Sequence, residues 1–255
     1  MSKFIDKLNR ASTTNTQSMG FRTAQPISKK PKILIIASLN QANIDNAANC
    51  VTGADAGLLH LSDLSSAANA IKEISQTIPD IPWGILPEKI DREIVTSNCD
   101  FVAFSAVSTP LVVLQDNKLG KILILEESLN DNLVRTANEL SVDAVLIDSK
   151  YEEKSFLTWH HLMLFQRFAG MLTKPLLATV PPDITANELY ILWEAGIDGA
   201  LINIEARKST NSLKDLSQAI SNLAFPLQRK QGKAVPLLPH MNTILNSTDE
   251  DDELE

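Results

Sequence analysis

Glycine is scarce in this chain, and it is missing where a phosphate-binding loop would need it. The 255 residues include nine glycines, about half the usual proportion in globular proteins. Phosphate cradles generally use glycine in a loop that follows a strand, because the backbone must approach the anion closely. The loops after the last two hydrophobic runs begin VPPDIT and NIEARKST and contain no glycine. A phosphorylated substrate is therefore not expected, and no sequence fingerprint indicates a nucleotide cofactor.

Cysteine and long apolar runs are also rare or missing. The two cysteines, Cys50 and Cys99, lack a metal-ligand spacing and suit a reducing cytoplasm. No uninterrupted apolar run approaches the roughly 20 residues that a membrane span needs. The amino terminus, MSKFIDKLNRAS, has no apolar stretch suited to a secretory signal, although its Ser/Thr content leaves a transit peptide as an alternative. We expect a soluble cytoplasmic protein with no membrane partner.

The chain also has no excess of basic residues. The net charge is −8, and the tail TDEDDELE holds six acidic groups, which leaves −2 for the rest of the chain. A near-neutral body argues against nucleic-acid binding, although a few basic residues near the termini keep it as the least favoured alternative. These residues are Lys29, Lys30, Arg229 and Lys230. The acidic tail is typical of a solvated, disordered end.

Eight short hydrophobic runs alternate with helix-like segments along residues 32–224. Four of the runs have an aspartate in second place, and they are ADAGLLH (54–60), CDFVAFS (99–105), VDAVLID (142–148) and IDGALIN (197–203). The four others begin with Lys or Pro, and they are KILIIAS (32–38), PWGILPE (82–88), KILILEE (121–127) and KPLLATV (174–180). Continuously apolar strands that alternate with helices indicate a parallel sheet covered by helices. Eight such units predict a closed (β/α)8 barrel.

Helix signals agree with this fold. Apolar residues recur at three- and four-residue intervals in 65–78, 130–140 and 212–223, and Thr185 with Glu188 predicts a capping box. The segment 106–120 is a poor helix and is expected to be an irregular connection. The prediction is one barrel domain over 31–225, preceded by a helix and mobile linker over 1–30 and followed by an extension with the acidic tail over 226–255. One side of the first helix carries Phe4, Ile5 and Leu8, which we expect to dock on the outside or to close the base of the barrel.

The repeated aspartate has a structural interpretation. It lies in the turn from helix to strand, at the amino-terminal end of the barrel, where a short carboxylate can accept backbone N–H bonds. Residues at that end of a barrel generally contribute to stability rather than to catalysis.

Side-chain alternation along the strands predicts which residues surround the barrel mouth. Two and four positions after the aspartate come residues expected to face the helices, namely Gly57, Val102, Val145, Ala200, Leu59, Phe104, Ile147 and Ile202. Five positions after it come His60, Ser105, Asp148 and Asn203. The same count from the first residue of the other runs reaches Ala37, Pro87, Glu126 and Thr179. We therefore predict a polar layer at the carboxyl-terminal mouth, where barrel enzymes place their chemistry, made of His60, Ser105, Glu126, Asp148, Thr179 and Asn203.

The barrel region resembles the aldolase-type (β/α)8 superfamily over about three quarters of the chain, chiefly in AGIDGALINI (195–204) and VDAVLID. Within that superfamily, LILEESLN (123–130) and VDAVLID are similar to strands five and six of the metal-dependent 2-keto-acid aldolases, which place a Glu and an Asp there. The resemblance implies that Glu126 takes the place of the Glu. Asp148 departs from the family position, which follows a Gly-Pro turn that this chain lacks. The arginine general base of the family has no counterpart in HLSD (60–63).

The polar layer contains candidates for catalysis and for metal binding. Glu126 and Asp148 could offer oxygen ligands to Mg²⁺ or Mn²⁺, or they could simply satisfy one another at a hydrated barrel end. His60 is a candidate proton carrier, because its unperturbed pKa lies near neutrality. Lys150, directly after the sixth run, is a candidate Schiff-base lysine.

Other residues are expected to contact the substrate. Ser105, Thr179 and Asn203 belong to the polar layer, and Arg207 follows the last run. Secondary candidates, whose positions are more typical of exposed loop charges, are Asp63, Glu88 and Glu127.

Two functions compete for this barrel. The first is a lyase or isomerase-type enzyme that acts on a small non-phosphorylated metabolite at an open mouth. The alternative is a catalytically silent barrel for binding or assembly, with its mouth filled by loop residues and an apolar contact surface around Trp159 and Phe165. Such a surface would also suit a homo-oligomer. In the same segment, His160 and His161 are not expected to share a metal, because adjacent helical residues point about 100° apart.

Overall fold

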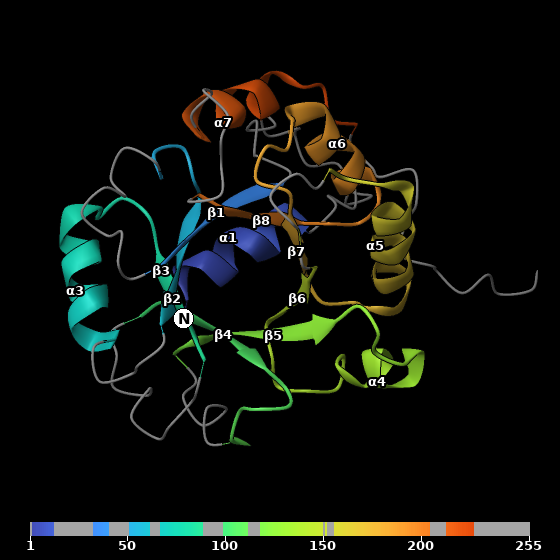
Figure 1. Ribbon diagram of the computed structural model, residues 1–255, viewed down its shortest axis with the longest axis horizontal. Helices are drawn as coiled ribbons and strands as arrows, with labels where there is room; N and C mark the ends of the chain where they lie inside the picture. The colour runs from blue at the N-terminus through green and yellow to red at the C-terminus, as the bar shows by residue number, and fades with distance from the viewer. Residues whose placement is uncertain are drawn as a thin grey trace, which may run out of the picture.

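A closed barrel of eight parallel strands forms the centre of the protein (Figure 1). The computed structural model describes residues 2–12, 33–40, 51–61, 67–88, 99–111, 118–149, 151, 156–204 and 213–226. Each strand pairs with the next in the sequence, and the last pairs with the first. The strands are β1 (Leu34–Asn40), β2 (Ala56–Leu61), β3 (Trp83–Pro87), β4 (Phe101–Ser105), β5 (Gly120–Glu126), β6 (Ala144–Asp148), β7 (Leu176–Val180) and β8 (Gly199–Asn203). Each strand overlaps one of the eight predicted runs, so the predicted (β/α)8 barrel is confirmed.

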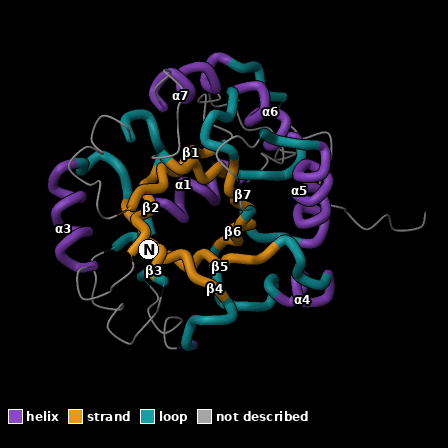
Figure 2. Tube along the Cα trace, in the orientation of Figure 1, coloured by secondary structure: helices purple, strands orange, loops and turns teal. Residues whose placement is uncertain are grey.

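Helices surround the strands (Figure 2). They are α3 (Ala67–Thr77), α4 (Asp131–Thr136), α5 (Trp159–Met171), α6 (Ala186–Glu194) and α7 (Leu213–Asn222). The predicted capping box opens α6: the Glu188 backbone N–H donates to Thr185 Oγ1 at 3.3 Å, and the Thr185 N–H donates to Glu188 Oε2 at 2.8 Å. The described parts of 106–120 form turns before β5 begins, which agrees with the expected irregular connection.

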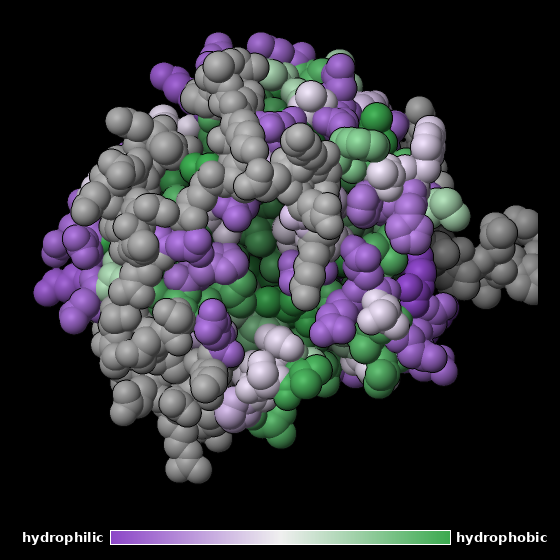
Figure 3. All heavy atoms as spheres, in the orientation of Figure 1, coloured by the Kyte–Doolittle hydropathy of each residue, from purple (hydrophilic) through white to green (hydrophobic). Residues whose placement is uncertain are grey.

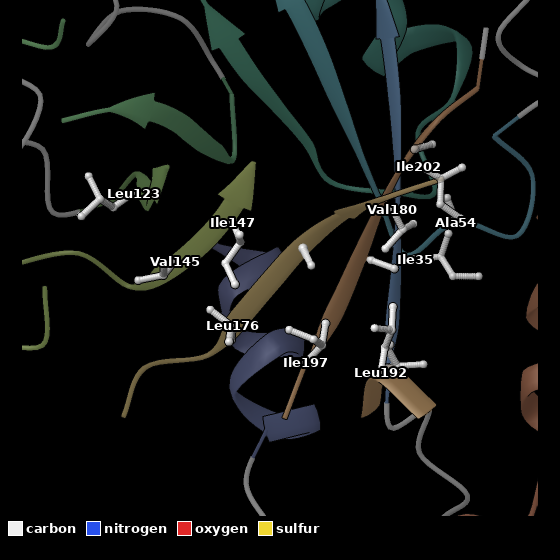
Figure 4. Packing of buried hydrophobic residues seen from close by; sticks show 14 of the residues in the cluster. Ile35, Ala54, Leu123, Val145, Ile147, Leu176, Val180, Leu192, Ile197 and Ile202 are labelled. Carbon is white, nitrogen blue, oxygen red and sulfur yellow. The ribbon is translucent and has the colours of Figure 1, made fainter. Parts of the chain in front are cut away.

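Apolar side chains fill two layers, one on each side of the strands. All the residues predicted to face the helices, apart from Gly57, are buried in the layer between strands and helices. Figure 4 shows part of this layer, where Ile35, Val180 and Ile202 lie close together. Gly57 faces the same way, because a Cβ built on it would lie 2.1 Å from the Trp83 ring. The second layer fills the barrel interior with apolar residues from the strands. Alternation along the strands therefore places side chains as predicted.

The repeated aspartates join neighbouring strands at the amino-terminal end of the barrel. Asp55 accepts the Ile35 N–H at 3.0 Å, Asp143 accepts the Lys121 N–H at 2.8 Å, and Asp198 accepts the Leu176 N–H at 2.9 Å. These acceptors satisfy N–H groups at the start of the preceding strands. The structural role predicted for the aspartates is confirmed.

Asp100 uses the same position differently and holds α1 (Lys3–Ser12) against the base of the barrel. Its carboxylate accepts Ser2 Oγ–H at 2.7 Å and the N–H groups of Lys3 at 2.7 Å and Phe4 at 2.9 Å. The Phe4 ring packs on the Phe101 ring with centroids 4.7 Å apart. Phe4, Ile5 and Leu8 are buried in the interior layer. Of the two placements expected for this helix, the structure shows closure of the base.

The described strands and surrounding helices run from Leu34 to Asn222, within the predicted barrel domain. The predicted linker over 13–30 and the acidic tail lie outside the described residues. In the described part of the chain, every helix is too short or too polar to cross a membrane.

Candidate functional site

An open cavity of about 910 Å³ lies at the carboxyl ends of the strands. Its lining residues are Asn40, His60, Leu61, Leu86, Pro87, Glu88, Ser105, Ser108, Ile124, Glu126, Glu127, Ser128 and Asp148. Figure 3 shows this end of the barrel hollowed, with apolar residues deep in the hollow and hydrophilic residues around it. Below it, a void of about 10 Å³ lies in the barrel interior above Phe4. Because side chains fill the interior and α1 closes the base, a ligand can reach this cavity only from the mouth.

The predicted polar layer is largely assembled here. His60, Ser105, Glu126 and Asp148 line the cavity. Thr179 belongs to the same layer, and its Oγ1 donates to Asp148 Oδ1 at 3.2 Å. Asn203 lies at the end of β8, beside Ser38 in the strand register, and does not line the cavity.

The count that located these residues is wrong on β1 and one residue out of register on β3, although Pro87 itself lines the cavity. Ala37 faces the helices, and the inward-facing positions of β1 are Leu34, Ile36 and Ser38. On β3, the register aligns Leu86 rather than Pro87 with His60. Counting works from the aspartates because the backbone N–H of each one donates to a carbonyl oxygen at the start of the preceding strand, on Ile35, Trp83, Lys121 and Leu176. The Lys or Pro that begins the other runs has no such fixed position: β1 begins two residues after Lys32, whereas β5 begins one residue before Lys121.

Ser38 and His60 form a hydrogen-bonded pair beside the cavity, which the sequence did not reveal. Ser38 is 4% exposed, and its Oγ lies 2.7 Å from His60 Nε2. His60 is half-buried and lies opposite Asn40 in the register between β1 and β2. The inward series Leu34, Ile36 and Ser38 carries the missed signal, because it ends in a polar residue. Ser38 fixes the orientation of the imidazole by binding one of its two ring nitrogens.

Four carboxylates from the ends of β3, β5 and β6 line the cavity. Glu126 and Asp148 are exposed Cα partners at the ends of β5 and β6. Glu88 and Glu127, which the sequence indicated as loop charges, also line the cavity. No group of three or more His, Cys, Asp or Glu within the described ranges is placed to hold a metal ion. Two carboxylates with water ligands still suit Mg²⁺, which usually keeps several waters in proteins.

Three other candidates are not placed. Asp63, Lys150 and Arg207 lie outside the described residues. The Schiff-base prediction for Lys150 and the substrate contact of Arg207 therefore stay predictions.

Arg167 on α5 holds the loop that follows β5. Its guanidinium donates to the carbonyl oxygens of Glu127 at 3.3 Å and Leu129 at 2.8 Å. The same group forms a salt bridge with Asp131, the first residue of α4. Because an arginine fork can bind several acceptors in fixed directions, this contact positions the segment that carries Glu127 and Ser128 at the cavity edge.

The apolar contact surface predicted around Trp159 and Phe165 is wrong in one of its two residues. Phe165 is buried in the core, so it cannot belong to an exposed contact surface, whereas Trp159 and Met163 are exposed. A helix lying on a barrel buries only the stripe that faces the strands. His160 and His161 do not act together, because His161 Nδ1 accepts the Thr158 N–H at 3.1 Å to complete the capping box of α5.

This cap makes the stability of α5 depend on pH. Burial lowers the pKa of His161 below its usual value; His160 acts in the same direction and Glu127 opposes both. Close by, burial raises the pKa of the Tyr151 hydroxyl, so this group stays neutral in the same range. Protonated His161 cannot accept the Thr158 N–H. The stabilisation is therefore complete above the unfolded-state pKa of about 6.5 and is lost as the pH falls towards the lower folded-state pKa.

We expect the substitution His161→Gln to remove this part of the pH dependence, because glutamine at this position also completes a capping box. Between pH 8 and pH 5, the melting temperature of the parent protein should fall more than that of the variant. The measurement is thermal unfolding followed by circular dichroism, with His160→Gln as the control. Parallel curves for the parent and His161→Gln would show that the cap does not titrate.

Comparisons with known proteins agree on the fold. No protein-family model and no curated protein matches the sequence. A mutant tryptophan synthase alpha-subunit from Pyrococcus furiosus aligns with a TM-score of 0.57 at 10% identity, covering 74% of this chain and 98% of that one. KGPDC from Streptococcus mutans aligns with a TM-score of 0.58 at 8% identity, covering 74% and 97%. For 3-hexulose-6-phosphate synthase the values are 0.55, 11%, 74% and 98%. The chain has the (β/α)8 barrel fold, and identities this low say nothing about its substrate.

Proposed function

We propose that the protein is an enzyme of the lyase or isomerase type that moves a proton on a small, non-phosphorylated metabolite. The observation that carries the proposal is the cavity at the barrel mouth, where His60 is held by the buried Ser38. A half-buried histidine with one nitrogen fixed can present its ring to a substrate in a defined direction. General acid–base catalysis needs such a group within hydrogen-bond reach of the proton that is moved.

Other residues of the mouth would bind the substrate. Ser105 offers a hydroxyl in the cavity lining, and Thr179 steadies Asp148 through its hydrogen bond. Arg207, in the segment after β8, is proposed as a further substrate contact, whereas Asn203 is not, because it does not line the cavity. Lys150 remains a candidate for covalent catalysis, in which its amine would form a Schiff base with a carbonyl substrate.

A divalent ion suits the two neighbouring carboxylates of this proposal. Glu126 and Asp148 would hold Mg²⁺ or Mn²⁺ with water completing the coordination sphere. Such an ion, when bound, would polarise a carbonyl oxygen of the substrate. The carboxylates would then serve the reaction by holding the ion at one side of the cavity.

One observation favours a binding or assembly module as the second candidate. Phe156, Trp159 and Met163 expose large apolar side chains at the start of α5, at 72%, 81% and 68% of their accessible area. Clusters of exposed aromatic residues are typical of contact surfaces. A homo-oligomer formed through this surface is compatible with either function, because the surface lies on the outer side of the barrel.

The enzyme proposal is tested by incubating the purified protein with a metabolite extract at neutral pH. Mass spectrometry should show at least one compound consumed and one formed in proportion, because the mouth is open and carries a proton carrier. Asp148→Asn serves as the matched variant, since it keeps the side-chain shape but removes a charge from the site. Equal composition of the extract after incubation with the parent protein and with Asp148→Asn would favour the binding module.

A further inference from the structure

The charged groups that line the cavity are almost all negative. Glu88 follows β3, Glu126 and Glu127 lie at the end of β5, and Asp148 ends β6, so four carboxylates line the cavity. The described lining contains neither lysine nor arginine. His60 is its sole basic group among the described residues.

The segments outside the described residues have no excess of basic residues. The strand-to-helix segments that lie outside the described residues are 41–50, 62–66, 89–98, 112–117, 150, 152–155 and 205–212. Together they contain six basic and eight acidic residues. By sequence, these segments therefore carry no net positive charge.

Two of the carboxylates end neighbouring strands. Glu126 and Asp148 are Cα partners on β5 and β6. None of the four carboxylates forms a salt bridge with another described residue. A hollow with apolar walls at its base focuses the field of charges at its rim. Such a field favours a positively charged ligand.

We infer that the substrate of the proposed enzyme carries a positive charge, as an ammonium or guanidinium group. This inference rests on the proposed function and names the substrate class of the same site. The charged group binds between Glu126 and Asp148 in place of a divalent ion, and each carboxylate can accept its N–H bonds. The same field disfavours phosphorylated and carboxylated metabolites, in agreement with the missing glycines of the strand-to-helix loops.

The barrel order also orients this substrate. In a ring of eight strands, β2 and β6 lie four strands apart and so face each other across the mouth. A ligand whose cationic end lies against Asp148 on β6 extends towards His60 on β2. The reacting carbon therefore lies away from the charged group, on the side of the cavity where Ser38 holds the imidazole.

Binding probes test the charge class directly. Putrescine and agmatine are the cationic probes, 1,4-butanediol is the neutral isostere of putrescine, and succinate is the anionic counterpart. We expect the intact protein to bind the two cations in calorimetry and to show no measurable binding of the diol or succinate. Glu126→Gln and Asp148→Asn should each weaken cation binding about 1.5-fold to fivefold, the range for exposed ion pairs.

The control variant is Glu73→Gln, which removes one exposed carboxylate from α3, away from the mouth. It should bind both cations as the intact protein does. Raising the salt concentration from 0.05 M to 0.5 M should weaken binding to the intact protein, because salt screens exposed charges. Equal binding of the diol and putrescine, or equal affinity of Glu126→Gln and Glu73→Gln, would overturn the inference.

A separate arm uses MgCl2 and MnCl2 without organic cations. Stabilisation by these salts alone, lost in both mouth variants, would assign the carboxylates to a metal and overturn the cationic substrate. His60→Gln separates the inference from the proposed function, because this variant should keep its affinity for putrescine. If cations bind but turnover survives in His60→Gln, the acid–base mechanism is wrong and the charge inference stands.

Discussion

The substitution His60→Gln is expected to slow turnover of the substrate about 100-fold to 10,000-fold, the contribution that a positioned general acid or base usually makes. Glutamine is close in size to histidine and can still bond to Ser38, whose Oγ lies 2.7 Å from the imidazole. It cannot take up or release a proton near neutral pH. The loss should therefore fall on kcat, while the affinity for the substrate changes little. The measurement is steady-state kinetics on the compound that the metabolite screen identifies.

His160→Gln is the matched control for this experiment. His160 is an exposed histidine on α5 and does not line the cavity. Its replacement should leave kcat within a factor of about two, as is usual for surface changes away from a site. A comparable rate in His60→Gln and His160→Gln would remove His60 from the mechanism.

The substitution Phe4→Ala is expected to lower the free energy of unfolding by about 3–5 kcal/mol, the usual range for a buried phenylalanine. Phe4 has no exposed area, and its ring packs 4.7 Å from the Phe101 ring at the base of the barrel. Its removal opens a cavity beneath Ile36, Leu58 and Ala103, which line the small void above it. The measurement is urea-induced unfolding, with Lys3→Ala as the exposed control on the same helix.

A double-mutant cycle shows whether the loss comes from the docking of α1. Asp100→Ala removes the three hydrogen bonds that the carboxylate accepts from residues 2–4. Because either change undocks the same helix, the combined loss should be smaller than the sum of the single losses. Additive losses would mean that the two side chains stabilise the barrel independently of each other.

The repeated aspartate shows how much could be predicted from sequence. Each of Asp55, Asp100, Asp143 and Asp198 marks a strand start, and the residues counted from them lie where alternation requires. The repeated aspartate and the count from it were sufficient to predict the barrel fold and the position of His60, Ser105 and Asp148 at the mouth. The count from Lys32 missed Ser38 by one residue, because nothing in the sequence ties that lysine to a neighbouring strand.

Sequence could not show which charges share a cavity. Glu88 and Glu127 look like loop residues along the chain, and only the staggered ends of β3 and β5 bring them beside Glu126. Arg167 likewise gives no local signal. It lies 40 residues after Glu127. Its hydrogen bond to the Glu127 carbonyl oxygen forms because α5 packs beside α4.

Periodicity by itself determined the order of strands and helices and the inward or outward direction of most strand residues, because these depend on local backbone geometry. The tertiary structure decided the rest: α1 closes the base, Ser38 meets His60, and four carboxylates face one cavity. These contacts join residues far apart in the chain, and their formation depends on barrel closure and strand stagger. No short stretch of sequence records either property, since both arise from all eight strands together.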